Sequence, residues 1–257
     1  MTPKASCHVE NSEEFIRQKY EEDRECLKEA YNFLKQIAKH LMRGQAIVNT
    51  AMVYFLKYTR IHSVSQINKY LVASACFLLA AKWKDEPVRI EYLVEWYIFL
   101  ETKRTSNNSK TDFSTSKKYD YSNRIQEQEF DILCEIGFDC ETDLPNKYIA
   151  QFAASPLGKT IFTKSDFSKY AYMFANDSFM TTCALYYPAQ HIAAAAIYMA
   201  IIYISTSGSN SAQNKAETSS FDTNEWYKTI DETLDLATII EVKDEIKKCY
   251  AKKASSS

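Results

Sequence analysis

The chain has 257 residues, of which 46% are hydrophobic and 25% charged, and only four are glycine. This is enough apolar sequence for one large or two ordinary cores, whereas so little glycine disfavours all-β and doubly wound α/β folds, whose turns and phosphate loops need it. The net charge of −2 is spread without a basic stripe, which argues against direct nucleic-acid binding. We therefore predict an all-α globular protein.

The first half of the chain shows a helical repeat of apolar residues in five segments. The first ten residues are polar and unpatterned, and a charged helix is expected to begin at Glu14. Its later turns place Lys28, Glu29, Lys35 and Lys39 opposite an apolar face, as on a solvated surface. Gly44 is expected to mark the break after it. The other four helices are predicted at Gln45–Tyr58, Gln66–Trp83, Arg89–Leu100 and Tyr121–Ile136, with a solvated loop at Glu101–Lys118 and a left-handed cap at Gly137.

The helix Gln66–Trp83 is the predicted centre of this half. Apolar and small side chains surround nearly its whole circumference, which is typical of a helix buried on all sides. Its last turn carries Lys82, a charge that the carbonyl end of a helix favours, before Pro87 ends the element. We expect a buried helix that presents one lysine at the surface.

The second half repeats this organisation. Asp143-Leu144-Pro145 is a helix start signal, and helices are predicted at Asn146–Ala154, Asp166–Thr181, Pro188–Ile204, Asn224–Leu234 and Thr238–Tyr250, with a polar linker at Ser205–Ser220. When the two halves are aligned at an offset of about 120 residues, small residues align with small ones and large with large ones, as in an internal duplication. The matched positions are Val72, Ala73, Ala75, Leu79 and Ala80 with Ile192, Ala193, Ala195, Met199 and Ala200.

Several classes of protein are disfavoured by the residues themselves. The seven cysteines stand singly without CxxC pairs, as in a reduced intracellular protein. The apolar run Ala189–Ile204 contains Gln190 and His191 and is shorter than a span of about 20 residues, so we expect a buried helix and no membrane association. The four histidines show no metal-ligand spacing. Ser155–Thr160 ends like a phosphate-binding loop, but Ala153 stands where that loop needs glycine. No metal, cofactor or catalytic site is expected.

Four stretches carry a resemblance to a known family. They are IVNTAMVYFLKY (Ile47–Tyr58), SACFLLAAKWKDEPVRIEYLV (Ser74–Val94), FDILCEIGFD (Phe130–Asp139) and FANDSFMTTCALYYPAQHIAAAAIYMA (Phe174–Ala200). A pair of five-helix repeats whose central helix ends in LLAAKW resembles the cyclin box. The last stretch is similar to the second box of the transcription-associated cyclins of the K, T and L types.

The resemblance implies a fold, a partner and a site. The fold would be two tandem five-helix cyclin boxes at residues 21–141 and 142–252, after an N-terminal extension 1–20. Lys82 and Glu129 match the lysine and glutamate with which cyclins grip the kinase ahead of its regulatory helix. Leu79, Trp83, Leu133 and Phe138 match their apolar surroundings. The chain departs from the family at Trp83, where relatives carry a small aliphatic residue, and at Lys84, where they carry an acid, and these changes are expected to affect which kinase is chosen.

The function implied is that of a regulatory subunit without catalysis of its own. It would bind and activate a cyclin-dependent kinase in the nucleus, with the RNA polymerase II tail or related transcription factors as substrates. One alternative is a general transcription factor of the TFIIB-like kind, which also uses tandem cyclin folds. Another is a helical adaptor that has lost kinase binding, which the departures at Trp83 and Lys84 keep open.

Overall fold

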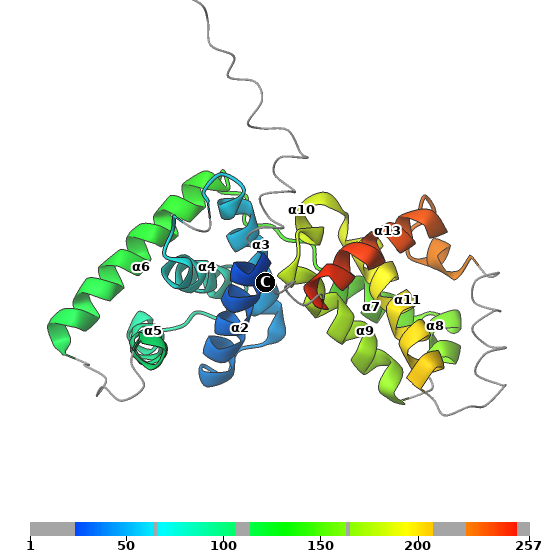
Figure 1. Ribbon diagram of the computed structural model, residues 1–257, viewed down its shortest axis with the longest axis horizontal. Helices are drawn as coiled ribbons and strands as arrows, with labels where there is room; N and C mark the ends of the chain where they lie inside the picture. Colours follow the sequence, from blue (N-terminus) through cyan, green and yellow to red (C-terminus); the bar gives the residue numbers. More distant parts are fainter. Residues whose placement is uncertain (1–23, 64–65, 106–113, 163–164, 208–224, 251–257) are drawn as a thin grey trace, which may run out of the picture. The chain divides into compact units, whose positions relative to one another are not determined.

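The computed structural model describes residues 24–63, 66–105, 114–162, 165–207 and 225–250. Within these residues the regular structure is helical throughout, which confirms the predicted all-α class. The chain divides into two compact units, Met1–Cys140 and Glu141–Ser257 (Figure 1). The predicted extension 1–20, the helix start at Glu14 and residues 208–220 of the predicted linker lie outside the described residues.

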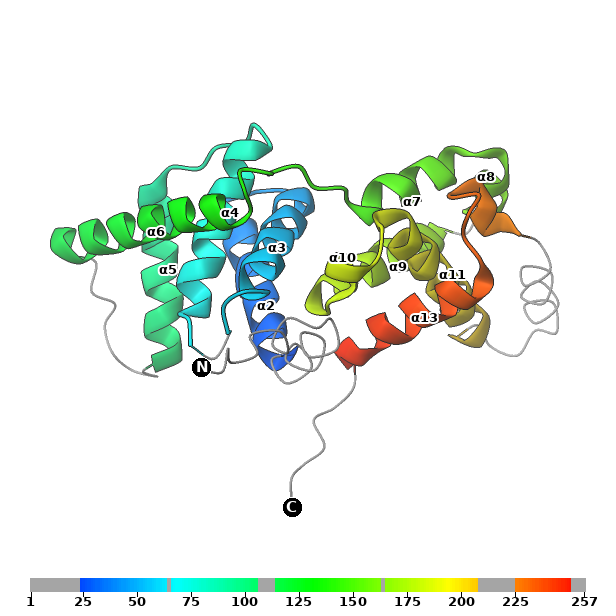
Figure 2. The same cartoon turned by 90° about the horizontal axis from the view of Figure 1, so that it is seen from above.

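The first unit is built around one central helix. Its described helices are α2 (Arg24–His40), α3 (Gln45–Thr59), α4 (Lys69–Trp83), α5 (Ile90–Thr105) and α6 (Thr115–Glu135). Helix α4 packs against each of the other four, and every residue from Tyr70 to Ala81 is buried (Figure 2). Its alanines and Ser74 let neighbouring backbones approach, while Phe77 fills the space between them. The predicted central helix is thus confirmed, with Lys82 in its last turn.

The start of α4 is tied to α2 by a small polar cluster. Glu29 on α2 pairs with Lys69, Nζ to Oε2 2.5 Å, and accepts a hydrogen bond of 2.8 Å from the Tyr70 hydroxyl. The bond from Lys69 is the main reason why the pKa of Glu29 lies below its ordinary value. The ionised carboxylate is therefore more favourable in the folded chain than in the unfolded chain.

This shift predicts a stability difference that depends on pH. A carboxyl group with a lowered folded pKa stabilises the fold above its unfolded pKa, and this stabilisation is lost as the pH falls through the folded pKa. We expect Glu29→Gln to lower the free energy of unfolding by less than about 1 kcal/mol at neutral pH, because the Glu29 side chain is about half exposed. Urea denaturation at neutral pH and near pH 3 measures the difference, which should narrow in acid. A difference of equal size at both pH values would contradict the prediction.

Three described helices of this unit, α2, α4 and α6, are followed by a residue with a positive φ: Met42, Asp85 and Gly137. After α6, Gly137 has φ 66°, and the N–H groups of Gly137 and Phe138 donate to the carbonyls of Cys134 and Leu133, as in a Schellman motif. The predicted left-handed cap is confirmed. Helix α2 ends in the same way, with Met42 at φ 51°. Gly44 lies in the break between α2 and α3, as predicted; it has an extended conformation and caps the start of α3.

Helices α5 and α6 are longer than predicted. The expected loop Glu101–Lys118 is wrong at both ends, since α5 continues to Thr105 and α6 begins at Thr115, with residues 106–113 outside the described residues. These turns are polar, but they are held by contacts between the two helices. The Tyr121 hydroxyl donates to Glu101 over 2.7 Å, and Lys118 pairs with Glu95 at 2.5 Å. Because these contacts are polar, the spacing of apolar residues could not predict them.

The second unit also has a buried central helix, α11 (Ala189–Ser207), which packs against helices on several sides (Figure 2). The Ala189–Thr206 window has a mean hydropathy of 1.4, which by length and composition would allow it to span a membrane. Its residues Ile192–Ile197 are buried in the core of this unit. The surrounding described elements are α7 (Pro145–Ala154), α8 (Pro156–Ile161), α9 (Ser165–Asp177), α10 (Cys183–Tyr186) and α13 (Leu236–Lys247), with short 3₁₀ turns at Ser178–Met180, Trp226–Thr229 and Lys248–Tyr250.

Two features of this unit correct the sequence analysis. The predicted helix Asn224–Leu234 is wrong: its described part contains the 3₁₀ turn Trp226–Thr229 and then a bend in which Asp231 accepts from the Thr233 N–H over 2.9 Å. The short helices α8 and α10 were not predicted. Residues matched at the offset of 120 are all buried, each in the central helix of its own unit.

The phosphate-loop-like segment is the start of α8. Ser155 caps this helix by accepting from the Gly158 N–H over 2.9 Å, and its hydroxyl donates to the Phe152 carbonyl over 2.7 Å. A Cβ at Gly158 would lie 1.8 Å from the Phe152 carbonyl oxygen. The glycine is therefore needed for the close approach of α7 and α8, which is a packing role.

Candidate functional site

A lysine and a glutamate from different helices meet at the surface of the first unit. Lys82, in the last turn of α4, places Nζ 2.7 Å from Oε2 of Glu129 on α6. About half of the Lys82 side chain is exposed, whereas Glu129 is 8% exposed. The structure therefore brings together the two residues that the sequence analysis paired.

The Glu129 carboxylate is incompletely satisfied. Its Oε1 is buried and has no hydrogen-bond partner among the described residues. A buried carboxylate oxygen without a donor costs free energy, and an N–H group from a docked chain would remove this cost. Lys82 uses one donor on Glu129 and has two more N–H bonds for carbonyl groups. The pair can thus accept from and donate to the backbone of a partner at one place.

Large apolar side chains are exposed on the same two helices and in the turn after α6. Trp83 is 49% exposed, Phe130 62% and Phe138 63%. Leu133 is half-buried on the same helix as Glu129, one turn further on. We call this surface the α4–α6 patch; it consists of Lys82, Trp83, Glu129, Phe130, Leu133 and Phe138. An exposed apolar area together with a polar pair is typical of a surface that binds another protein.

Two of the predicted site residues differ in their exposure. Leu79 is 7% exposed, so it is a core residue of α4, one turn before Lys82 and Trp83, and not part of the surface. Phe138 is exposed, and its backbone has φ 59°. A bulky residue rarely adopts this conformation, and such backbone strain is frequent at functional sites.

The end of α6 is held in place by helix α3. The Tyr54 hydroxyl donates to the Cys140 carbonyl over 2.6 Å, and burial raises the pKa of Tyr54, so the donor stays protonated. Gln128, next to Glu129, donates to the Tyr58 hydroxyl over 3.1 Å, and Lys57 pairs with Asp139 at 3.5 Å. These bonds position the α4–α6 patch before any partner binds.

The sequence analysis missed Phe130. It lies one turn before Leu133, so helical spacing places it on the side of α6 that Leu133 occupies. From the sequence, an apolar residue in this part of α6 is equally compatible with the core. Only the 62% exposure of Phe130 assigns it to the surface.

The described histidines form no metal site. No group of three or more His, Cys, Asp or Glu side chains in the described part of the chain is arranged to hold a metal ion. His62 lies 3.4 Å from Glu135, and His191 lies 3.5 Å from Asp231, each as a single pair. The ring of His40 stacks on Trp96 with centroids 3.9 Å apart. His8 lies outside the described residues.

Comparisons with known proteins identify the family. The model of the cyclin N-terminal domain matches residues 3–141. Cyclin-T1 of Mus musculus is 23% identical over 227 residues, covering 84% of this chain and 28% of the relative. Cyclin-L1-1 of Arabidopsis thaliana is 26% identical over 157 residues, covering 61% of this chain and 36% of the relative. The resemblance to T- and L-type cyclins is thereby confirmed.

The fold comparison agrees. A chain in the crystal structure of the yeast RNA Pol II CTD kinase CTDK-1 complex superposes with a TM-score of 0.70 at 16% identity, covering 93% of this chain and 72% of that one. The present chain spans only about a third or less of the two curated relatives. The domain match extends over more than half of the chain, and the chain belongs to the cyclin family.

Proposed function

We propose that this chain is the regulatory subunit of a cyclin-dependent protein kinase that acts in transcription, and that it binds the kinase through the α4–α6 patch. The observation that carries the proposal is the Lys82–Glu129 pair, with its unpartnered Oε1 and the exposed aromatic side chains of the α4–α6 patch. The kinase-binding residues are Lys82, Glu129, Trp83, Leu133 and Phe138, with Leu79 in the core of α4 and Phe130 as an addition.

The patch suits a helix and the loop before it. Lys82 and Glu129 would bond backbone carbonyl and N–H groups at the start of the kinase's regulatory helix, where such groups lack partners within the helix. The aromatic side chains would bury the helix's apolar face. Trp83 presents a larger and flatter surface than a small aliphatic residue, which supports a role in the choice of kinase.

Docking would activate the kinase by selecting one position of that helix. Phosphoryl transfer requires a glutamate of the helix to pair with the lysine that contacts ATP, and a partner that binds only the inward position shifts the population toward it. The kinase supplies nucleotide, magnesium and the catalytic residues, so the present chain needs no catalytic site. Because similar chains include Cyclin-T1 and a chain of a CTD kinase complex, we propose the RNA polymerase II tail as substrate and the nucleus as location.

The test is reconstitution with purified kinases. The chain is incubated with each of a panel of cyclin-dependent kinases, and phosphate incorporation into an RNA polymerase II tail peptide is measured. If the free kinase holds its helix inward about 1% of the time, binding should raise the rate about 100-fold with one of them. Trp83→Glu and Phe130→Glu should abolish this rise, whereas Met42→Glu, at an exposed apolar residue outside the patch, should not.

Other outcomes identify the alternatives. If the chain binds no kinase but binds promoter DNA with initiation factors, the TFIIB-like function replaces the proposal. If it binds a kinase without activating it, the chain is an adaptor. If the chain alone phosphorylates the peptide, the proposed absence of catalysis is wrong.

A further inference from the structure

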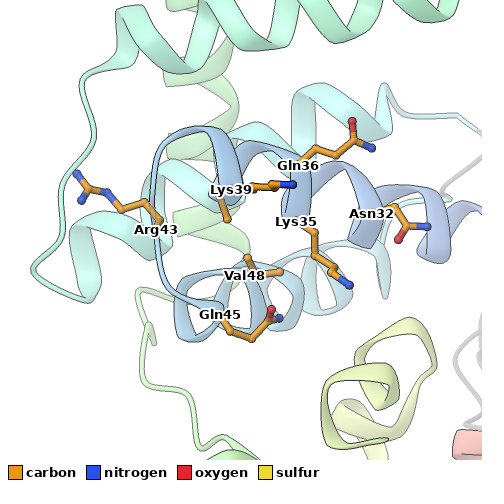
Figure 3. A pocket seen from close by; sticks show the side chains of 8 residues that line it. Asn32, Lys35, Gln36, Lys39, Arg43, Gln45 and Val48 are labelled. Carbon is orange, nitrogen blue, oxygen red and sulfur yellow. The ribbon is translucent and has the colours of Figure 1, made fainter. Parts of the chain in front are cut away.

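A groove between α2 and α3, lined mainly by residues with polar or charged side-chain ends, lies outside the α4–α6 patch and shares no residue with it. Its volume is about 580 Å³. Figure 3 shows Lys35 and Lys39 projecting from α2 and Gln45 from α3 around this space. The groove is lined by Asn32, Lys35, Gln36, Ala38, Lys39, Arg43, Gln45 and Val48.

The charge in this groove has one sign. Lys35 and Lys39 are one helical turn apart, about 6 Å along the axis, and both are exposed. No acidic residue lines the groove, and neither lysine has a carboxylate partner among the described residues. Like charges four residues apart repel each other. The carbonyl end of α2 favours Lys39, but Lys35 lies one turn earlier, where this effect has faded.

Several other lysines of the same unit are neutralised by a carboxylate. Lys57, Lys69 and Lys118 pair with Asp139, Glu29 and Glu95 at 3.5 Å or less. The first turn of α3, which opens at the groove, has no acidic residue either. Lys35 and Lys39 are therefore two neighbouring positive charges without a carboxylate partner among the described residues, beside a groove that no acidic residue lines.

The remaining lining is held in place and can contact a peptide backbone. Gln45 donates through Nε2 to the Tyr31 hydroxyl over 3.1 Å and to Asn49 Oδ1 over 2.8 Å, which fixes its amide. Arg43 donates to the Pro87 carbonyl over 3.1 Å, and Figure 3 shows its side chain leading away from the two lysines. Asn32 and Gln36 supply exposed amide groups beside the lysines.

We infer that this groove binds a phosphorylated peptide, with the phosphate of a phosphoserine or phosphothreonine between Lys35 and Lys39. A phosphate carries a charge of about −1.5 to −2 and three acceptor oxygens, so it can bond two ammonium groups at once. The amide side chains of Asn32 and Gln36 match the donors and acceptors of the peptide backbone beside it.

A nucleic acid fits this groove less well. Single-stranded nucleic acids bind along extended basic tracks with aromatic rings for base stacking. No aromatic residue lines this groove, and the positive charge is confined to the last turns of α2 and the turn after it. The assignment does not depend on kinase binding, since the isolated chain can be tested for it.

The test measures binding of the chain to two fluorescein-labelled degenerate peptide libraries by fluorescence anisotropy. One library has a central phosphoserine and the other a serine at the same position. We expect the phosphorylated library to bind at least about tenfold more tightly, and the difference to shrink as salt is added. Lys35→Glu with Lys39→Glu should remove the preference.

Two controls keep the result specific. Lys159→Glu with Lys169→Glu changes the net charge by the same amount at exposed lysines of the second unit and should retain the preference. Lys35→Gln with Lys39→Gln removes the positive charges without adding negative ones and should also abolish it, while circular dichroism reports the fold. Equal binding of the two libraries, an equal loss in the second-unit control, or stronger competition by single-stranded RNA than by the phosphorylated library would overturn the inference.

Discussion

Exchanging the charges of Lys82 and Glu129 is expected to leave the first unit folded and to abolish kinase binding. The variant Lys82→Glu with Glu129→Lys restores an opposite-charge pair at the same place, where Nζ and Oε2 are now 2.7 Å apart. A backbone carbonyl of the docked kinase would then meet a carboxylate in place of an ammonium donor. A backbone N–H would meet an ammonium in place of a carboxylate acceptor. Because mispairing a desolvated charge costs about 3 kcal/mol or more, the affinity should fall at least about 100-fold.

The single changes separate stability from binding. Glu129→Lys alone places two positive charges together, and Lys82→Glu alone places two carboxylates together. Each should lower the free energy of unfolding by about 1 kcal/mol, because water reaches the half-exposed Lys82, and the exchange should recover most of this loss. Calorimetric titration with the kinase and urea denaturation of the free chain measure the two quantities.

A matched control lies on α2. Lys28 and Glu25 form an ion pair of 3.9 Å away from the α4–α6 patch. Their exchange makes the same chemical change and should affect neither binding nor activation. If the exchange at Lys82 and Glu129 also retained both, the pair would be a structural ion pair and the proposed contacts would be wrong.

Phe77→Ala is expected to destabilise the first unit by about 3–5 kcal/mol. Phe77 is fully buried in α4, the helix that packs against the other four described helices of this unit. Removing its ring leaves a cavity that several helices would have to fill together. The midpoint of urea denaturation measures the loss.

Phe138→Ala is the matched counterpart at the surface. The ring of Phe138 is 63% exposed, so its removal should change the free energy of unfolding by no more than about 0.5 kcal/mol while weakening kinase binding. The two variants make the same chemical change with opposite consequences. A large loss of stability from Phe138→Ala, or none from Phe77→Ala, would show that the packing described here is incorrect.

The helices that could be predicted are those whose apolar residues show a regular pattern, either on one face or on every side. The segment Gln66–Trp83 was recognised because a helix surrounded by other helices needs apolar and small residues on every side, and α4 has them. Elements stabilised by polar contacts were predicted too short. The last turn of α5 and the first turns of α6 depend on Glu101, Tyr121 and Lys118, whose partners lie on another helix.

The residues of the candidate site could be named from the sequence, but which of them are exposed could not. Leu79 and Trp83 lie one turn apart on the same helix, and periodicity treats them alike. Helix packing covers the first to 7% exposure and leaves the second at 49%. Phe130 was missed for the same reason, since an apolar residue beside Glu129 has no sequence signal that distinguishes core from surface.

The sequence by itself determined the all-α class, the two central helices and the placement of Lys82 at a helix end, because these follow from local propensity and from the spacing of side chains along one helix. Only the tertiary structure decided that Lys82 meets Glu129, that Oε1 of Glu129 has no donor among the described residues, and that Lys35 and Lys39 face a groove without a carboxylate. Each of these depends on which side chains a second helix brings near, and helical spacing says which face a residue occupies but not what covers that face.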